Sequence, residues 1–154
     1  MYCDHTLDAQ GRLVDVLWSS VQQQGQISRF GGCTQLDTTV FTNRRYGCHP
    51  LFVVGVDDEN RRCILGQGLL RSESTETFEW ILNRYEAAAG CRKPKKSLSS
   101  GCRHNRAVHG LSHPLTTYVY PFPLVILTDA DLAMSAAIDS CWPRTLHLHC
   151  LWHV

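Results

Sequence analysis

The chain has 154 residues, of which 44% are apolar and 19% charged, and its formal net charge at pH 7 is +1. These values fit a single globular domain with a sizeable core, and they exclude a disordered chain. No apolar run approaches the roughly 20 residues that cross a bilayer. The first six residues lack the charged-then-apolar pattern of a secretion signal, so we expect neither membrane insertion nor export.

The eight cysteines allow two interpretations. They could form a disulfide scaffold, or they could stay reduced inside the cell. Because they are spread over ordinary sheet and helix patterns with no secretion signal, we favour reduced intracellular thiols.

The first half of the chain predicts mainly strands. Residues 3–18 form a predicted hairpin with turn residues at 8–11, and the polar stretch 22–26 is interpreted as a connection. Three strand candidates follow, at about 33–41, 50–57 and 61–70. The polar turn at 57–60 indicates that the last two are antiparallel neighbours.

The second half predicts helices that alternate with strands. Ser74 is a candidate N-cap, and Gly90 ends the helix that follows. Its apolar face consists of Phe78, Ile81, Leu82, Tyr85, Ala88 and Ala89. A short apolar strand is expected at 124–128, a helix at 130–140 and another strand at 145–149.

Residues 92–123 lack periodicity and contain four prolines, so we interpret them as a disordered insert. The insert is a genuine insertion or translated non-coding sequence. It carries six bases and no acid, while the rest of the chain carries nine bases against fourteen acids. Basic segments attract phosphate backbones, although a solvated insert explains the same charges. The candidate DNA-contacting residues are Arg92, Lys93, Lys95 and Lys96.

Two carboxylates stand where apolar, strand-like runs end or are interrupted. Asp37 follows Leu36, and Asp129 follows the run 124–128. A carboxylate at a strand end is a poor core residue but a good ligand for a hard divalent cation. To bring both carboxylates together, we expect the strands at about 33–41, 50–57, 61–70 and 124–128 to form one sheet, with the strands that end at Asp37 and Asp129 adjacent. Asp37 is otherwise an exposed strand residue, and either Asp129 or Asp131 is otherwise the N-cap of the next helix.

Five segments together resemble the Mutator-like (MULE) transposase domain, whose plant relatives include the domesticated far-red-response regulators. The segments are LDTT at 36–39 with TNRRYG at 42–47, FVVGVD at 52–57, TFEW at 77–80, TDADLAM at 128–134 and CLWH at 150–153. Their order along the chain matches the family, and the resemblance covers most of the chain outside the insert.

The resemblance implies an α/β fold of the ribonuclease-H-like type, a mixed sheet with flanking helices. We expect residues 1–30 to be a hairpin lead-in and 31–154 to be a partial transposase domain, incomplete at the C-terminus. Asp37 and Asp129 match the first two catalytic acids, which bind Mg²⁺ or Mn²⁺, and Asp131 is then the helix cap. The family's third carboxylate has no match before Val154.

The C-terminal segment 147–153 contains three histidines and a cysteine. Thiolate and imidazole are the preferred ligands of Zn²⁺, and the family carries a Cys-x-x-His motif here, matched by Cys150 and His153. This pair binds Zn²⁺ or orders the site without metal.

Two classes of function remain open at this point. The resemblance implies metal-dependent cleavage and transfer of DNA strands at transposon ends, by a fragment or degenerate form of the enzyme. Alternatively, the chain is a domesticated, non-catalytic derivative that binds DNA or protein. The resemblance implies DNA as a partner and a nuclear location, while the oligomeric state stays open.

Overall fold

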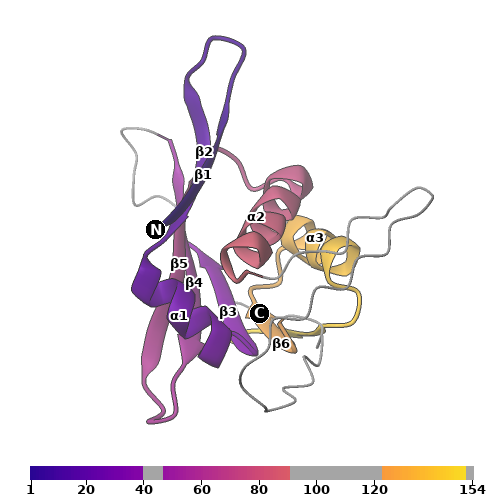
Figure 1. Ribbon diagram of the computed structural model, residues 1–154. Helices are drawn as coiled ribbons and strands as arrows, with labels where there is room; N and C mark the ends of the chain where they lie inside the picture. The colour runs from indigo at the N-terminus through magenta and orange to yellow at the C-terminus, as the bar shows by residue number, and fades with distance from the viewer. Residues whose placement is uncertain (40–46, 91–122, 152–154) are drawn as a thin grey trace, which may run out of the picture.

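The computed structural model describes residues 1–39, 47–90 and 123–151. Within them, seven strands and three helices form a mixed α/β structure around one sheet (Figure 1). The elements in chain order are β1 (Tyr2–Leu7), β2 (Leu13–Ser19), α1 (Val21–Phe30), β3 (Cys33–Thr38), β4 (His49–Val56), β5 (Arg62–Leu70), α2 (Thr75–Ala88), β6 (Val125–Thr128), α3 (Leu132–Cys141) and β7 (Leu146–His149). None of the helices in these ranges has the length and apolar content that a bilayer crossing requires.

The strands lie in the order β1-β2-β5-β4-β3-β6-β7. β3 is antiparallel to β4 and parallel to β6, and β7 extends the parallel part beyond β6. The four predicted strands therefore share one sheet, and the strand that carries Asp37 is adjacent to the strand that precedes Asp129. Both predictions are confirmed, although the last residues of the candidate strand 33–41 lie outside the described ranges.

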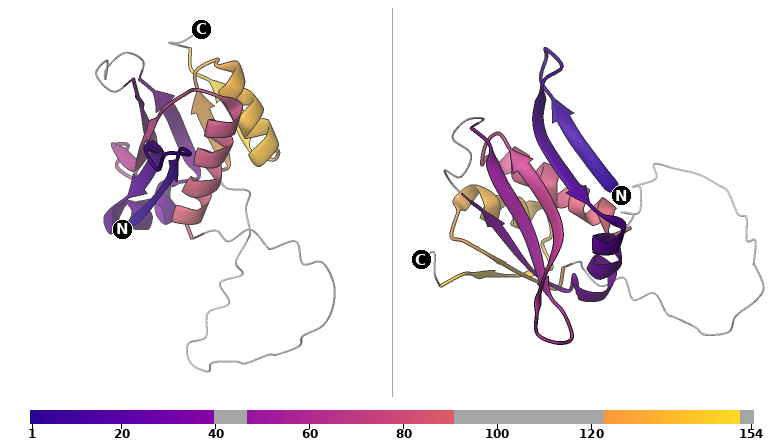
Figure 2. Two further views of the ribbon diagram at one scale, coloured as in Figure 1. Left: turned by 90° about the horizontal axis from the view of Figure 1, so that it is seen from above. Right: turned by 90° about the vertical axis from the view of Figure 1, so that its left-hand side faces the viewer.

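The core lies between the sheet and the pair α2 and α3, which pack together on one side of it (Figure 2). α2 begins where predicted, because the Ser74 hydroxyl accepts a hydrogen bond of 3.3 Å from the backbone N–H of Thr77. Its i, i+3, i+4 spacing turns one apolar stripe inward. The fully buried side chains of α2 and α3 are Phe78, Ile81, Leu82, Tyr85, Met134, Ala137 and Ile138.

The interpretation of residues 22–26 as a connection is wrong, because they form most of the first two turns of α1. The helix begins with a capping box: the Ser20 hydroxyl accepts from the backbone N–H of Gln23, and the Gln23 side chain accepts from the backbone N–H of Ser20. Ile27 is 1% exposed and anchors the helix in the core. A reciprocal cap and one apolar anchor are sufficient for this short helix.

The predicted N-terminal hairpin is confirmed as β1 and β2, and β2 pairs with β5 at one edge of the sheet. A buried carboxylate on β2 connects the hairpin to the end of β5. Asp15 is 6% exposed and accepts hydrogen bonds of 2.9 Å from the Thr6 hydroxyl and from the backbone N–H of Arg71. The predicted division of the chain at residue 30 stays a prediction, and the predicted insert 92–123 lies outside the described residues except for Pro123.

Two turns, between β1 and β2 and between β4 and β5, share one design. In each, the first carboxylate, Asp8 or Asp57, accepts hydrogen bonds from backbone N–H groups two and four residues later. The same carboxylate accepts from Nε of the arginine four residues later, Arg12 at 2.7 Å or Arg61 at 3.0 Å. Polar sequence in these turns is thus tied into a local network.

Candidate two-carboxylate site

Asp37 lies one residue before the end of β3, opposite Phe52 of β4. Side chains alternate along a strand. Leu36 and Thr38 are buried on the side of the core, so the half-buried Asp37 points to the other face. No hydrogen bond from another described residue reaches its carboxylate.

Asp129 follows β6 directly, at the turn into α3, and is also half-buried. Its Oδ1 accepts a long hydrogen bond of 3.3 Å from the backbone N–H of Asp131. Asp131 is the helix cap, since its side chain accepts a bond of 2.7 Å from the backbone N–H of Met134. The predicted division of roles, with Asp131 as the cap, is confirmed for Asp131.

The register of β3 and β6 places the two acids at the same level of the sheet. Cys33 pairs with Val125 and Gln35 with Leu127 in a parallel arrangement. Two residues further along each strand stand Asp37 and Asp129. Neighbouring strands lie about 4.8 Å apart, so the two backbones are well within the reach of one cation site.

The two carboxylates are ligands of the type that Mg²⁺ or Mn²⁺ prefers, but they are fewer than such an ion requires. Carboxylate oxygens are the ligands that hard cations prefer, and such ions require about six oxygens. In ranges 1–39, 47–90 and 123–151, no group of three or more His, Cys, Asp or Glu side chains could hold a metal ion. Asp37 and Asp129 as catalytic or metal-binding residues therefore stay a prediction.

A polar network that the sequence analysis missed ties the same end of the sheet together. The Thr38 hydroxyl donates a hydrogen bond of 2.6 Å to Oε1 of Glu73, which precedes α2. Oε2 of Glu73 lies 3.6 Å from Nδ1 of His49 at the start of β4, an ion-pair distance rather than a hydrogen bond. Glu73 belongs to no recognisable sequence motif, so its role in the network is visible only from its contacts.

The end of β7 contains the other candidate metal ligands. His147 Nε2 lies 2.8 Å from the Thr128 hydroxyl, and the rings of His147 and His149 meet edge to face with centroids 4.8 Å apart. Burial first, and then the neighbouring His149, lower the pKa of His147, while Asp139 acts in the opposite direction. Cys150 follows β7, and His153 lies outside the described residues, so the predicted Zn²⁺ pair stays untested.

The basic candidates also lie outside the described part of the chain: Arg92, Lys93, Lys95 and Lys96. Their predicted contact with DNA stays a prediction.

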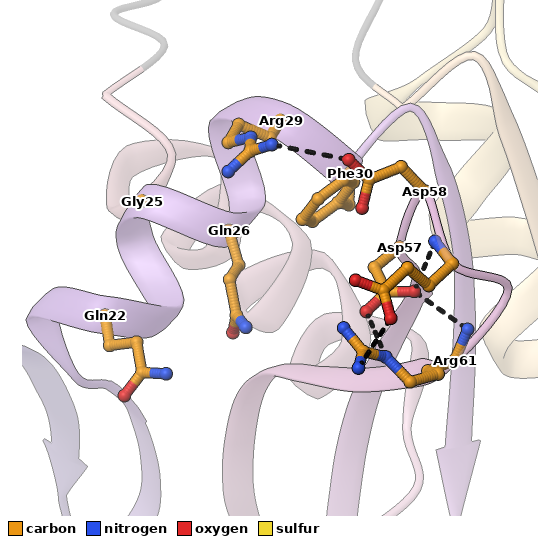
Figure 3. Close-up of a pocket in the computed structure, with 9 residues that line it drawn as sticks. Gln22, Gly25, Gln26, Arg29, Phe30, Asp57, Asp58 and Arg61 are labelled. Atoms are coloured by element: carbon orange, nitrogen blue, oxygen red, sulfur yellow. Dashed lines mark hydrogen bonds and ion pairs between the residues drawn. The ribbon is translucent and has the colours of Figure 1, made fainter.

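A cavity of about 580 Å³ lies between α1 and the turn from β4 to β5 (Figure 3). Its acids are paired: Asp58 lies 3.6 Å from Arg29, while Asp57 and Glu59 lie 3.0 and 2.8 Å from nitrogens of Arg61. Carboxylates that are engaged in this way are poor cation ligands. The cavity is thus chemically unlike the end of the sheet near Asp37.

The structure defines an α/β protein in which two carboxylates end adjacent parallel strands. No family model matches the chain. It is 27% identical over 142 residues to Protein FAR1-RELATED SEQUENCE 4 of Arabidopsis thaliana, covering 92% of this chain and 15% of that protein. It is also 27% identical over 148 residues to Protein FAR-RED IMPAIRED RESPONSE 1 of the same plant, covering 96% and 14%.

Protein FAR1-RELATED SEQUENCE 11 of Arabidopsis thaliana is likewise 27% identical, over 98% of this chain and 18% of its own length. The chain therefore spans less than a fifth of each of these relatives. Their names agree with the resemblance to plant far-red-response proteins that the motifs indicated.

Proposed function

We propose that the chain is the ribonuclease-H-like core of a Mutator-derived protein, of the domesticated regulator type, that associates with DNA in the nucleus without cutting it. The element order from β3 onward, β-β-β-α-β-α-β, supports this fold. The central β3, with an antiparallel neighbour on one side and a parallel neighbour on the other, supports it further. The similarity to FAR1-related plant proteins supports the regulator type.

The observation that carries the proposal is the shared level of Asp37 and Asp129 at the ends of adjacent strands. In a complete site of this kind, two divalent ions stabilise the attacking and leaving oxygens of a phosphodiester. Here the described residues supply two carboxylates and no third ligand nearby. Two carboxylates give weak binding of a single ion, so the isolated chain does not nick DNA.

A cation-binding measurement tests the paired carboxylates. We expect weak binding of Mn²⁺ to the wild-type chain by electron paramagnetic resonance titration, and a loss of this binding in Asp37→Asn and in Asp129→Asn. The matched control is Asp131→Asn, which removes a nearby charge that caps α3. It should keep Mn²⁺ binding while costing roughly 1 kcal/mol or less of stability. Equal binding by Asp37→Asn and the wild type would remove the pair from the proposal.

Incubation with supercoiled plasmid and Mn²⁺ tests the absence of cleavage. The expected result is intact plasmid with the wild-type chain and with every variant. Nicking that survives purification and disappears in Asp37→Asn would overturn the non-cutting function, and it would require a further ligand within the 154 residues.

The alignment of Asp37 and Asp129 on adjacent strands also favours a second candidate function. In a longer protein, another segment can add the missing carboxylate and complete a site for strand cleavage and transfer. Because the relatives are more than five times as long as the matched region, the test uses the full-length protein. Cleavage of transposon-end DNA that depends on Asp37 would establish this candidate and exclude the regulator type.

A further inference from the structure

A pair of histidines on β7 has the properties of a separate metal site. Among the described strands, β7 lies at the edge of the sheet and pairs with β6 alone. His147 and His149 are two residues apart and therefore project from the same face of the strand. Their ring centroids are 4.8 Å apart with an interplanar angle of 79°.

Hydrogen bonding at Thr128 determines which ring nitrogen of His147 is available. The Thr128 hydroxyl donates its single proton to the carbonyl oxygen of Asp129 at 2.7 Å. It can therefore only accept at its 2.8 Å contact with Nε2 of His147. Nε2 then carries the proton, and Nδ1 of the neutral ring presents a lone pair. A ligating histidine is commonly fixed in this way, by a hydrogen bond from its other nitrogen.

The ring separation agrees with chelation of one ion. A Zn–N bond of about 2.0–2.1 Å puts the metal roughly 3 Å from the centre of each ring. If both rings turned one nitrogen to a common ion while their centres stayed 4.8 Å apart, the two bonds would enclose roughly 100° at the metal, close to the tetrahedral angle that Zn²⁺ adopts. His149 is exposed, so its ring can rotate to complete the pair and water can fill the remaining positions.

We propose that His147 and His149 form a two-histidine site for a borderline divalent transition-metal ion, with Zn²⁺ as the first choice. The donor set differs from that of Asp37 and Asp129, since imidazole favours Zn²⁺, Cu²⁺ and Ni²⁺ and carboxylate favours Mg²⁺ and Mn²⁺. Cys150 lies beyond the last residue of β7 and is not part of the proposed ligand set. The proposed ligands therefore differ in kind from the Cys150 and His153 pair that the sequence analysis considered.

A bound ion would stabilise the pairing of β7 with β6. His147 already contacts Thr128 on β6, and Thr128 contacts the carbonyl of Asp129. Metal binding that requires the folded arrangement stabilises that arrangement by mass action. Zn²⁺ should therefore raise the melting temperature of the protein by holding β7 against β6.

Calorimetric titration of the full chain with ZnCl₂, together with thermal melting, tests the site. His149→Gln is the informative variant, because this exposed residue can be replaced without disturbing the contact to Thr128. We expect at least about a tenfold loss of Zn²⁺ affinity and loss of the thermal shift. Thr128→Val, which removes the partner of His147, should weaken binding on the order of tenfold.

Two control variants decide between sources of the Zn²⁺ signal. His5→Gln, on β1 at the opposite edge of the sheet, should bind Zn²⁺ as the wild type does. Cys150→Ser should also retain the affinity. Wild-type affinity in His149→Gln, or loss of binding in Cys150→Ser with His149 intact, would overturn the proposal and assign the ion to the cysteine instead.

Discussion

Gly68 sets the distance between β2 and β5. A Cβ atom at this position would lie 2.9 Å from the carbonyl oxygen of Val16, a backbone atom that cannot rotate away. The same construction at Gly66, two residues earlier on β5, meets only side chains and a carbonyl at 3.7 Å or more. Two glycines on one strand therefore have different steric roles.

This difference leads to a matched pair of substitutions. Gly68→Ala should lower the free energy of unfolding by about 1–3 kcal/mol, because β2 and β5 must separate to admit the methyl group. Gly66→Ala should be neutral or slightly stabilising, since a strand glycine costs conformational entropy. Urea unfolding of both variants measures the difference. Equal stability of the two would show that the strands separate freely at Gly68.

Sequence reasoning was effective for residues with a distinctive local role. The pattern left Asp129 and Asp131 as alternative caps, the family resemblance favoured Asp131, and the structure gives Asp131 the hydrogen bond from the backbone N–H of Met134. Glu73 could not be found in this way, because its partners Thr38 and His49 come from distant parts of the chain. Contacts of this kind depend on the assembled sheet.

The two related turns are the clearest example of local determination at the level of elements. Each turn has an aspartate first and an arginine fifth, and the fourth residue has a positive φ: Gly11 at 75° and Asn60 at 60°. Glycine and asparagine tolerate this left-handed conformation better than other residues. The sequence alone therefore positions both turns correctly.

The turn between β4 and β5 should contribute a pH-dependent part of the stability. The backbone N–H of Arg61 first, and then the Arg61 side chain and the N–H of Glu59, lower the pKa of Asp57. A carboxyl group with a lowered pKa in the folded state stabilises it above the unfolded value of about 3.9 and loses this contribution as the pH falls. The contribution should therefore disappear in acid.

Urea midpoints of wild type and Asp57→Asn measure this effect at about pH 6 and about pH 3, on either side of the ordinary aspartate value. The wild type should be more stable than the variant at the higher pH, and the gap should narrow at the lower pH. Asp58→Asn, which removes a charge 3.6 Å from Arg29 instead, is the control. If the stability difference between the wild type and Asp57→Asn were the same at both pH values, the effect would come from the shape of the side chain and not from its charge.

α1 shows the limit of prediction from pattern at this scale. Its residues are mostly polar, and the one that is buried is Ile27. The capping box of Ser20 and Gln23 was present in the sequence and was the signal that could have identified it.

At the scale of the whole molecule, β3 joins the antiparallel part of the sheet to the parallel part. The strands themselves were predicted from apolar runs, and the adjacency of β3 and β6 was predicted from the need to bring Asp37 and Asp129 together. The attachment of the N-terminal hairpin to β5 was not, because strand order at an edge is determined by long-range contacts such as those of Asp15. The sequence predicted which two carboxylates form the pair. Their alignment across the sheet could be read only from the register of β3 and β6.

The parallel pairing of β3 with β6 also has a consequence for the order of folding. β3, β4 and β5 are joined in sequence, whereas Cys33 meets Val125 across most of the chain. Contacts with large sequence separation form slowly, because loop closure must come first. We infer that β6 and β7 join after β3, β4 and β5, so pulse-labelled hydrogen exchange should protect the amides of β4 before those of β6. The level alignment of Asp37 and Asp129 would then be one of the final events in the maturation of the newly made chain.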